Sequence, residues 1–316
     1  MMRRTLLGLA AVSSLAFASM QPAHAEATKV RIMYTAASAF AAVFVAKDQG
    51  FFERHGVDAE LSIAQNGSVI LSGVVSGSVE VGLPTPTVVM QATQNGLDLR
   101  LFAATNVFPD PTVSGLIVGT DSGIKTPADT AGKKIGVPGI GGLIDVVVRK
   151  WINMNGGDAA KANIVEFSLP QTADVLRSRQ VDGAATLDPF LSRAVESGAG
   201  VSIGNYTDII PAGTAAGVLA TTTQWAEANA KAIEGMQLAL KEAADFIAQN
   251  PDGARESIGR YTTLPPQVLK GVNMPNVADL SLTPEKFQFW QDIALEQGLI
   301  SQPVDLNTLL IPFPKQ

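Results

Sequence analysis

The sequence predicts a two-lobed α/β protein, on the basis of three observations. Strand-like and helix-like segments alternate between residues 29 and 104, and again between residues 115 and 187, as in sheets flanked by helices. Proline-containing breaks at 108–111 and 210–213 bound the second stretch. Hydrophobic residues make up 46% of the 316 residues and charged residues 16%, which is enough apolar material for sizeable cores.

The first stretch reads as four strands with three helices between them. Residues 58–63 place Ala59, Leu61 and Ile63 on one side, which is the period of a strand. Ser38 is a candidate cap for the first helix, whose apolar residues recur at helical spacing. Strands are expected at 29–34, 58–63, 79–83 and 99–104, and helices at 38–52, 68–76 and 87–94.

The second stretch repeats this alternation, and the chain after it is mostly helical. Thr283 followed by Pro284 marks a helix start, and Gly298 marks its end. Asn250 and Pro251 are expected to end the long helix before it. Strands are expected at 115–118, 134–137, 164–168, 183–187 and 218–221, and helices at 143–154, 172–179, 225–249 and from 283 onward.

The two breaks predict that one lobe is inserted into the other. Residues 26–108 and 213–316 would form lobe one, residues 109–212 would form lobe two, and the crossing segments would form a hinge. Each lobe is expected to hold a mainly parallel sheet. Ligands of open α/β sheets bind beyond the carboxyl ends of the strands, so we expect a binding cleft between the lobes.

Residues 1–25 have the pattern of a signal peptide. Arg3 and Arg4 precede an apolar run at 5–20, and Ala23 and Ala25 stand where a signal peptidase reads small residues. The alternative is a membrane anchor, but the run is shorter than the roughly 20 residues that a spanning helix needs. We therefore expect cleavage after Ala25 and a periplasmic location.

Composition excludes several functions. Lys plus Arg number 23 and Asp plus Glu 29, so the net charge is −6, and −6 − 2 = −8 once Arg3 and Arg4 leave. An acidic chain without a basic cluster is a poor partner for nucleic acid. Cysteine is absent, which excludes disulfides, thiolate metal sites and cysteine nucleophiles. Cleavage would leave His55 as the only histidine, and it is expected at a surface turn. We therefore expect no catalytic residue, metal site or cofactor.

Four segments carry a family resemblance. They are VAKDQGFFERHGV at 45–57, GVVSGSVEVG at 73–82, AGKKIGVP at 131–138 and VDGAATLDPF at 181–190. Together they resemble periplasmic substrate-binding proteins of ABC transporters, in the nitrate, sulfonate and taurine (alkanesulfonate, NMT1/THI5-like) class. The resemblance implies a type II-like periplasmic-binding-protein fold and clamshell closure on a small solute. It also implies delivery to an inner-membrane permease with a cytoplasmic ATPase. We expect the protein itself to be a monomer.

Six loops are candidates for ligand contact because each follows a strand, opens a helix or lies at a hinge. Glycines let the backbone approach a ligand, and the glycine-rich loop could cradle an anion with its amides. That loop matches neither a dinucleotide fingerprint nor a P-loop. The candidates are Thr35, Ser38 and Phe40; Gln65, Asn66, Gly67 and Ser68; Pro84 and Thr85; Gly139, Ile140, Gly141 and Gly142; Asp188 and Phe190; and Thr214.

Several of these residues have a purely structural alternative. Ser38 would cap a helix, 65–68 would be an ordinary turn, and Asp188 would cap the helix after it. No Arg or Lys stands in these loops, whereas a doubly charged anion usually recruits a guanidinium group. A singly charged or neutral ligand is therefore expected, against an apolar wall of Phe40, Phe108 or Phe190.

Three functions remain open from the sequence. The leading one is solute capture for import. The second is an enzyme on the same scaffold, similar to thiamine-pyrimidine synthases, with Asp188 and a hydroxyl as an acid–base pair. Those synthases use a Cys-rich segment, which this chain lacks. The third is a sensory subunit that presents a ligand to a receptor.

Overall fold

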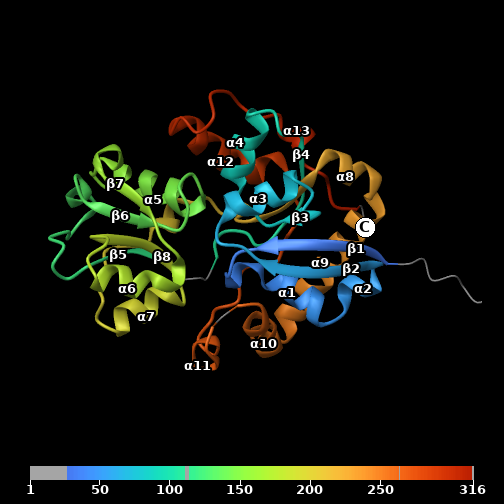
Figure 1. Ribbon diagram of the computed structural model, residues 1–316, viewed down its shortest axis with the longest axis horizontal. Coiled ribbons are helices and arrows are strands. Elements are labelled where there is room, and N and C mark those ends of the chain that lie inside the picture. The colour runs from blue at the N-terminus through green and yellow to red at the C-terminus, as the bar shows by residue number, and fades with distance from the viewer. Residues whose placement is uncertain (1–26, 111–113, 263, 315–316) are drawn as a thin grey trace, which may run out of the picture.

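The computed structural model of the protein describes residues 27–110, 114–262 and 264–314 (Figure 1). The predicted signal peptide, residues 1–25, lies outside the described residues and stays a prediction. Among the helices that are described, none has the length and apolar character needed to cross a membrane.

The strands form two five-stranded sheets in separate parts of the molecule (Figure 1). The first sheet has the order β2-β1-β3-β10-β4 and the second the order β7-β6-β8-β5-β9. We call the first sheet with the helices packed on it lobe one, and the second sheet with its helices lobe two. The strands of lobe one are β1 (Thr28–Tyr34), β2 (Val57–Ile63), β3 (Val81–Gly82), β4 (Leu99–Ala104) and β10 (Val218–Thr222). Those of lobe two are β5 (Ser114–Val118), β6 (Lys134–Val137), β7 (Asn163–Glu166), β8 (Gly183–Leu187) and β9 (Val201–Ser202).

The two-lobed α/β architecture is confirmed, and in each mixed sheet one strand runs against the direction of the other four. In lobe one, β1 runs parallel to β2 and β3, while β10 runs antiparallel to β3 and β4. In lobe two, β6 runs parallel to β7 and β8, while β5 runs antiparallel to β8 and β9. The reason is the path of the chain. β5 and β10 are the first strands after the chain passes between the lobes, so they enter at the edge where the parallel strands end.

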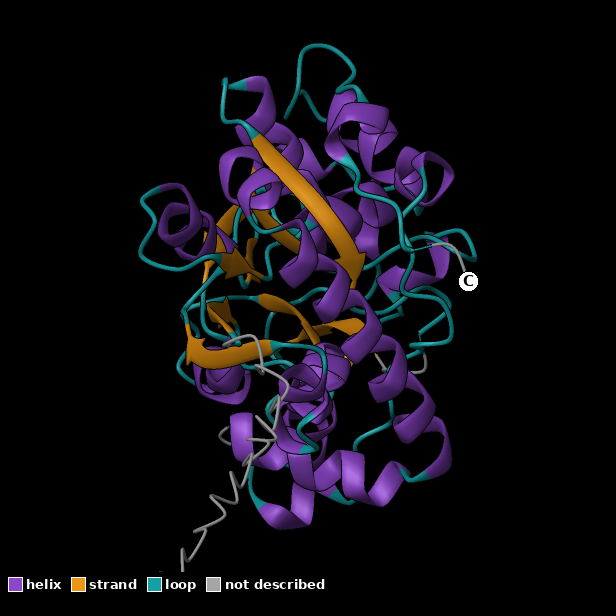
Figure 2. Cartoon of the chain, turned by 90° about the vertical axis from the view of Figure 1, so that its right-hand side faces the viewer, coloured by secondary structure: helices purple, strands orange, loops and turns teal. Residues whose placement is uncertain are grey.

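Helices cover both faces of each sheet (Figures 1 and 2). In lobe one, α3 (Gly67–Val75), α4 (Pro86–Gln94) and α12 (Pro284–Glu296) lie on one side, and α1 (Ala41–Asp48), α2 (Phe51–Arg54) and α9 (Ala230–Gln249) on the other. In lobe two, α5 (Leu143–Met154) covers one face, and α6 (Thr172–Arg177) and α7 (Phe190–Glu196) cover the opposite face. The remaining α-helices are α8 (Thr223–Ala228), α10 (Pro251–Tyr261), α11 (Pro266–Leu269) and α13 (Leu306–Leu309).

Two predicted helices are interrupted. The helix expected at 38–52 is a 3₁₀ turn at Ser38–Phe40 followed by α1 and α2, with Gly50 between them in the left-handed region at φ +70°. The helix expected at 225–249 is divided into α8 and α9 at Asn229. The long helix does end at Asn250, but Pro251 then opens α10, which was not expected.

The apolar core continues from one lobe into the other. A single cluster of buried residues joins lobe one to the α5 face of lobe two, where it includes Val118, Val137 and Val147. A separate, smaller cluster under α6 and α7 includes Ile117, Leu176 and Leu191. Val118 and Ile117 belong to different clusters because neighbouring strand residues point to opposite faces. The residue boundaries expected for the lobes remain a prediction.

Candidate functional site

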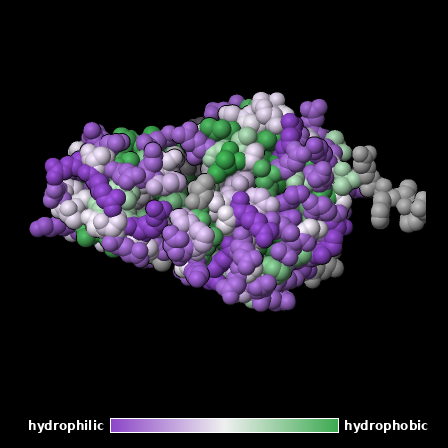
Figure 3. Space-filling model, turned by 60° about the horizontal axis from the view of Figure 1, so that its bottom comes forward, coloured by the Kyte–Doolittle hydropathy of each residue, from purple (hydrophilic) through white to green (hydrophobic). Residues whose placement is uncertain are grey.

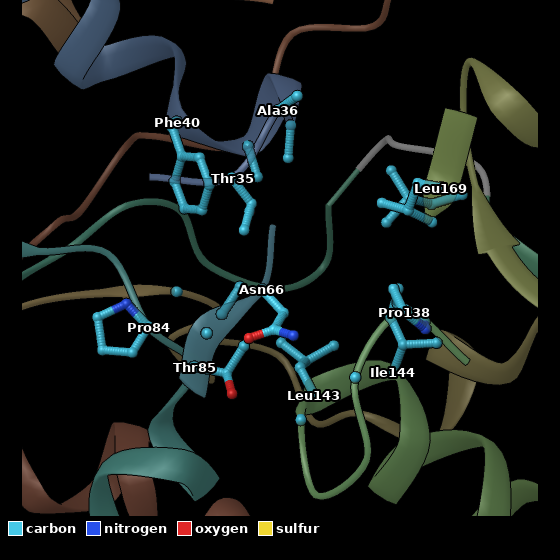
Figure 4. Close-up of a pocket in the computed structure, with 18 of the residues that line it drawn as sticks. Thr35, Ala36, Phe40, Asn66, Pro84, Thr85, Pro138, Leu143, Ile144 and Leu169 are labelled. Carbon is cyan, nitrogen blue, oxygen red and sulfur yellow. The ribbon is translucent and has the colours of Figure 1, made fainter. Parts of the chain in front are cut away.

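A cavity of about 360 Å³ lies where the ends of the two sheets face each other (Figure 4). The loops that follow β1, β2, β3 and β4 line it from lobe one, and the loops that follow β6 and β7 line it from lobe two. The antiparallel strands contribute the opposite ends: Ser114 opens β5, and Gly217 precedes β10. This is the cleft position expected for open α/β sheets. Apolar side chains gather where the two parts of the molecule meet (Figure 3).

Most of the predicted contact residues line this cavity. They reach it from segments of both lobes that are far apart in the sequence, as Figure 4 shows. The residues are Thr35, Ser38, Phe40, Gln65, Asn66, Gly67, Ser68, Pro84, Thr85, Gly139, Ile140 and Gly142. Ser38 does not cap a helix, because it lies inside the 3₁₀ turn and no side-chain cap bond is formed there. Contact with a ligand remains a prediction for all of them.

Four predicted residues lie outside the cavity lining. The Gly141 amide donates to Asp145, and the Gly141 carbonyl accepts from the Thr87 hydroxyl. Phe190 is buried in lobe two, and Thr214 is buried with its carbonyl accepting from the Phe108 amide at 2.8 Å.

Asp188 is the fourth. Its Oδ1 accepts from the Ser192 amide at 3.0 Å and from the Ser192 hydroxyl at 2.7 Å, in the first turns of α7. Asp188 therefore bonds to the helix that follows it, although Pro189 is the N-cap of α7, and it does not line the cavity.

Most polar side chains around the cavity are already paired within the protein. Asn106 accepts from the Thr105 hydroxyl at 2.9 Å and donates to Asp110 at 2.6 Å. Asn66 caps α3, with its Oδ1 accepting from the Val69 amide at 3.0 Å. Such groups gain little by bonding to a ligand, because their hydrogen-bonding capacity is partly used.

The Thr85 hydroxyl is not paired in this way. Its Oγ1 is buried and has no hydrogen-bond partner among the described residues. Thr85 precedes Pro86 at the start of α4, and its side chain makes no cap bond there. An unpaired buried hydroxyl costs free energy, so a ligand group that bonds to it gains affinity.

The cavity carries little charge. Among its described lining residues there is no Lys, Arg or His, and Asp110 is the carboxylate. Tyr206 is fully buried and donates to the Thr186 carbonyl at 2.7 Å. Burial raises the pKa of Tyr206, so its phenol stays neutral. Apolar surface comes from both lobes: Phe40, Val88, Phe108, Ile140, Leu143 and Leu169.

Apart from Asp110 and Tyr206, the titratable groups of the described residues lie outside the cavity lining. His55 ends α2 at a turn, as expected, and its Nε2 lies 2.7 Å from Glu242 Oε1, outside the cavity lining. Within the described part of the chain, no three His, Asp or Glu residues are grouped as ligands for a metal ion.

Sequence reasoning missed several lining residues. Asn106 follows β4 and Ser168 follows β7, so the strand-end rule applied to these two strands would have found them. Tyr206 carries no such signal, because it lies in the 3₁₀ turn Tyr206–Ile209 and reaches the cavity only through the fold of lobe two.

Comparison with known proteins identifies the family of the chain. Residues 37–254 match the family model described as NMT1/THI5 like. The chain belongs to the NMT1/THI5-like family. A protein of Brucella abortus (strain 2308), named provisionally as a binding protein, is 26% identical over 220 residues. That match covers 69% of this chain and 66% of the relative, so it spans just under two thirds of the relative's length.

Two solved structures of binding proteins share the fold. The alkanesulfonate-binding protein SsuA of Xanthomonas axonopodis pv. citri, bound to MOPS, superposes with a TM-score of 0.76 at 19% identity, over 91% of this chain and 99% of that one. The periplasmic nitrate-binding protein NrtA of Synechocystis PCC 6803 gives 0.75 at 16% identity, over 90% and 84%. The chain therefore has the periplasmic-binding-protein fold.

Proposed function

We propose that this protein is the solute-binding component of an ABC importer and releases its solute unchanged. The observation that supports this most is the cavity, which strand-end loops of both lobes line and at which the described residues assemble no metal-binding group. A site divided between two lobes suits capture by closure, since the ligand completes contacts with both halves only when they approach. The family and the named relatives support the same role.

The solute is a small organic anion with one charge, or a neutral heterocycle or aromatic compound. A divalent anion would enter a site without a cationic side chain among its described lining residues, and with Asp110 nearby. Phe40, Phe108 and Leu169 give the site apolar walls, which suit a ring or a short hydrocarbon body. The Thr85 hydroxyl would bond to the polar group of that solute.

The protein would act as a monomer in the periplasm after cleavage at Ala25. Its partners would be an inner-membrane permease and a cytoplasmic ATPase, which recognise the closed form. The hinge would lie where the chain passes between the predicted lobes, 26–108 with 213–316 and 109–212.

Mass spectrometry of the compound that co-purifies with the protein tests this function. Calorimetry with that compound on ligand-free protein should show binding at one site, and the compound should be recovered with unchanged mass. A changed mass would favour the enzyme alternative. A marked preference for divalent anions such as sulfate would contradict the solute class while leaving the transport role standing.

A further inference from the structure

The glycine-rich loop at 139–142 lies against lobe one as well as the cavity. A Cβ atom placed on Gly139 would lie 3.9 Å from the Asn66 Cβ, and one on Gly142 would lie 4.0 Å from the Thr85 Oγ1. Gly141 has φ +75°, and a Cβ there would lie 3.0 Å from the Gln91 Nε2. Glycine at 141 therefore allows a backbone conformation and a close approach between lobes that a larger residue would strain.

One peptide carbonyl of this loop is bound by the other lobe. The Thr87 hydroxyl of α4 donates to the Gly141 carbonyl at 2.8 Å, and Gln91 Nε2 approaches the same oxygen at 3.5 Å. Thr87 is fully buried, so water does not compete for this bond.

Lobe two fixes the position of Gly141 through its own hydrogen bonds. The Gly141 amide donates to Asp145 Oδ2 at 2.8 Å, and Asp145 is buried and paired with Arg149 at 2.6 Å. The neighbouring Ile140 amide donates to Glu166 at 2.8 Å. The Gly141 carbonyl is thus presented to lobe one by a loop fixed at several points.

Further along α5, two more polar contacts join the lobes. Gln297, at the end of α12, donates to the Val146 carbonyl at 2.7 Å, and Lys150 pairs with Glu296. The apolar cluster also passes from lobe one to α5 without a break. We call the contacts of Thr87, Gln91 and Gln297 with Gly141 and Val146, together with the Lys150–Glu296 pair, the interlobe latch.

The latch residues that donate from lobe one do not line the cavity: Thr87, Gln91 and Gln297 all lie outside it. Their bonds therefore need no ligand atom as a partner. We propose that the interlobe latch stabilises the closed arrangement of the two lobes from outside the cavity, with the Thr87–Gly141 bond as its central contact. Where the closed form is the one that binds, the apparent affinity rises with the fraction of closed molecules, so the latch would act on affinity from outside the site. Only this last consequence rests on the proposed function.

The test measures the distance between the lobes in ligand-free protein. The chain has no cysteine, so Met154→Cys on α5 and Asp292→Cys on α12 give two unique positions for spin labels beside the latch. Both residues are exposed. Bound solute is removed by unfolding and refolding, and pulsed electron paramagnetic resonance then gives the distance distribution.

Three variants in this labelled background separate the latch from general packing. Thr87→Val keeps the shape but loses the donor, while Thr87→Ser keeps the hydroxyl. Thr93→Val is the matched control, because Thr93 lies in the same helix and its buried hydroxyl has no partner in the described structure. Circular dichroism and thermal unfolding establish that each variant is folded.

In the ligand-free wild type we expect a short distance from closed molecules and a long distance from open molecules. In Thr87→Val the ratio of short to long distances should fall about five- to tenfold, as for the loss of one buried hydrogen bond. Thr87→Ser and Thr93→Val should resemble the wild type. A Thr87→Val distribution equal to that of the wild type, a wild type that is already open, or equal widening in all three variants would each overturn the proposal. These outcomes do not depend on whether a solute binds.

Discussion

The two faces of the lobe-two sheet differ in what they pack against. The α5 face joins a cluster that continues into lobe one, and it carries the latch. The α6–α7 face has its own small cluster within lobe two. We therefore expect the α5 side of the sheet to unfold together with lobe one. A destabilising substitution on the α6–α7 side should increase local unfolding within lobe two alone.

The largest effect is expected for Trp151→Ala on α5. Trp151 is buried in the shared cluster, and a Cβ on Gly204 would lie only 2.6 Å from its ring, so the packing there is tight. Removing a buried Trp side chain costs about 3–5 kcal/mol. Urea unfolding followed by hydrogen exchange should show that amides in β1 and in β6 both lose protection. Unchanged protection in β1 would contradict the coupling of the α5 face to lobe one.

A smaller and more local effect is expected for Leu191→Ala on α7. Leu191 belongs to the separate cluster, and the substitution should cost about 2–3 kcal/mol. Protection should fall in β5, β8 and α7 but not in β1. If β1 lost as much protection as β8, the two faces would not differ in the way described above.

Tyr206→Phe tests a polar contact on the shared face. The substitution removes the hydrogen bond from the phenol to the Thr186 carbonyl, so stability should fall by about 1 kcal/mol. Because burial keeps the phenol neutral, the loss should be the same at pH 6 and pH 9, as measured by thermal unfolding. A loss that disappeared at pH 9 would mean that the phenol ionises.

The smallest effect concerns lobe one alone, and it depends on pH. Burial acts to raise the pKa of Glu80, but hydrogen bonds from the side chain and amide of Arg31 lower it below its ordinary value of 4.5. A carboxylate with a lowered pKa stabilises the fold above that ordinary value, and the contribution is lost as the pH falls through the lowered pKa. Glu80→Gln should therefore reduce stability at pH 7 by less than about 1 kcal/mol, and by less still at pH 3.

Thermal unfolding of both proteins across this pH range is the measurement for Glu80→Gln. Glu60→Gln is the control, because Glu60 pairs with Lys29 at the exposed surface. A difference between wild type and Glu80→Gln that grew on acidification would show that the sign is wrong.

The sequence was sufficient to predict most strands and the longer helices of each lobe, because each has its own local pattern, but it did not predict β9, α10, α11 or α13. Strand direction was not predictable in the same way. Residues 218–222 have the same apolar character whether they run parallel or antiparallel, and their direction follows from the edge at which the chain enters the sheet.

The candidate site was predictable where a loop follows a strand, as for Thr35, Asn66 and Thr85. It was not predictable where two lobes meet. Gly141 reads as part of an anion cradle in the sequence, but its carbonyl is occupied by Thr87, a residue 54 positions away. Asp188 was ambiguous because the same carboxylate can face a ligand or a helix, and only the position of Ser192 decides between them.

The placement of β10 has a consequence for how the chain is completed as it emerges from the ribosome. β10 lies between β3 and β4 in the first sheet, although it follows every strand of the second sheet in the sequence. All strands of the second sheet lie between residues 114 and 202, so that sheet has its full set of strands before residue 218 exists. Until then β4 lacks the neighbour that joins it to β3. Lobe one is therefore synthesised first in part, but its sheet is completed only after that of lobe two.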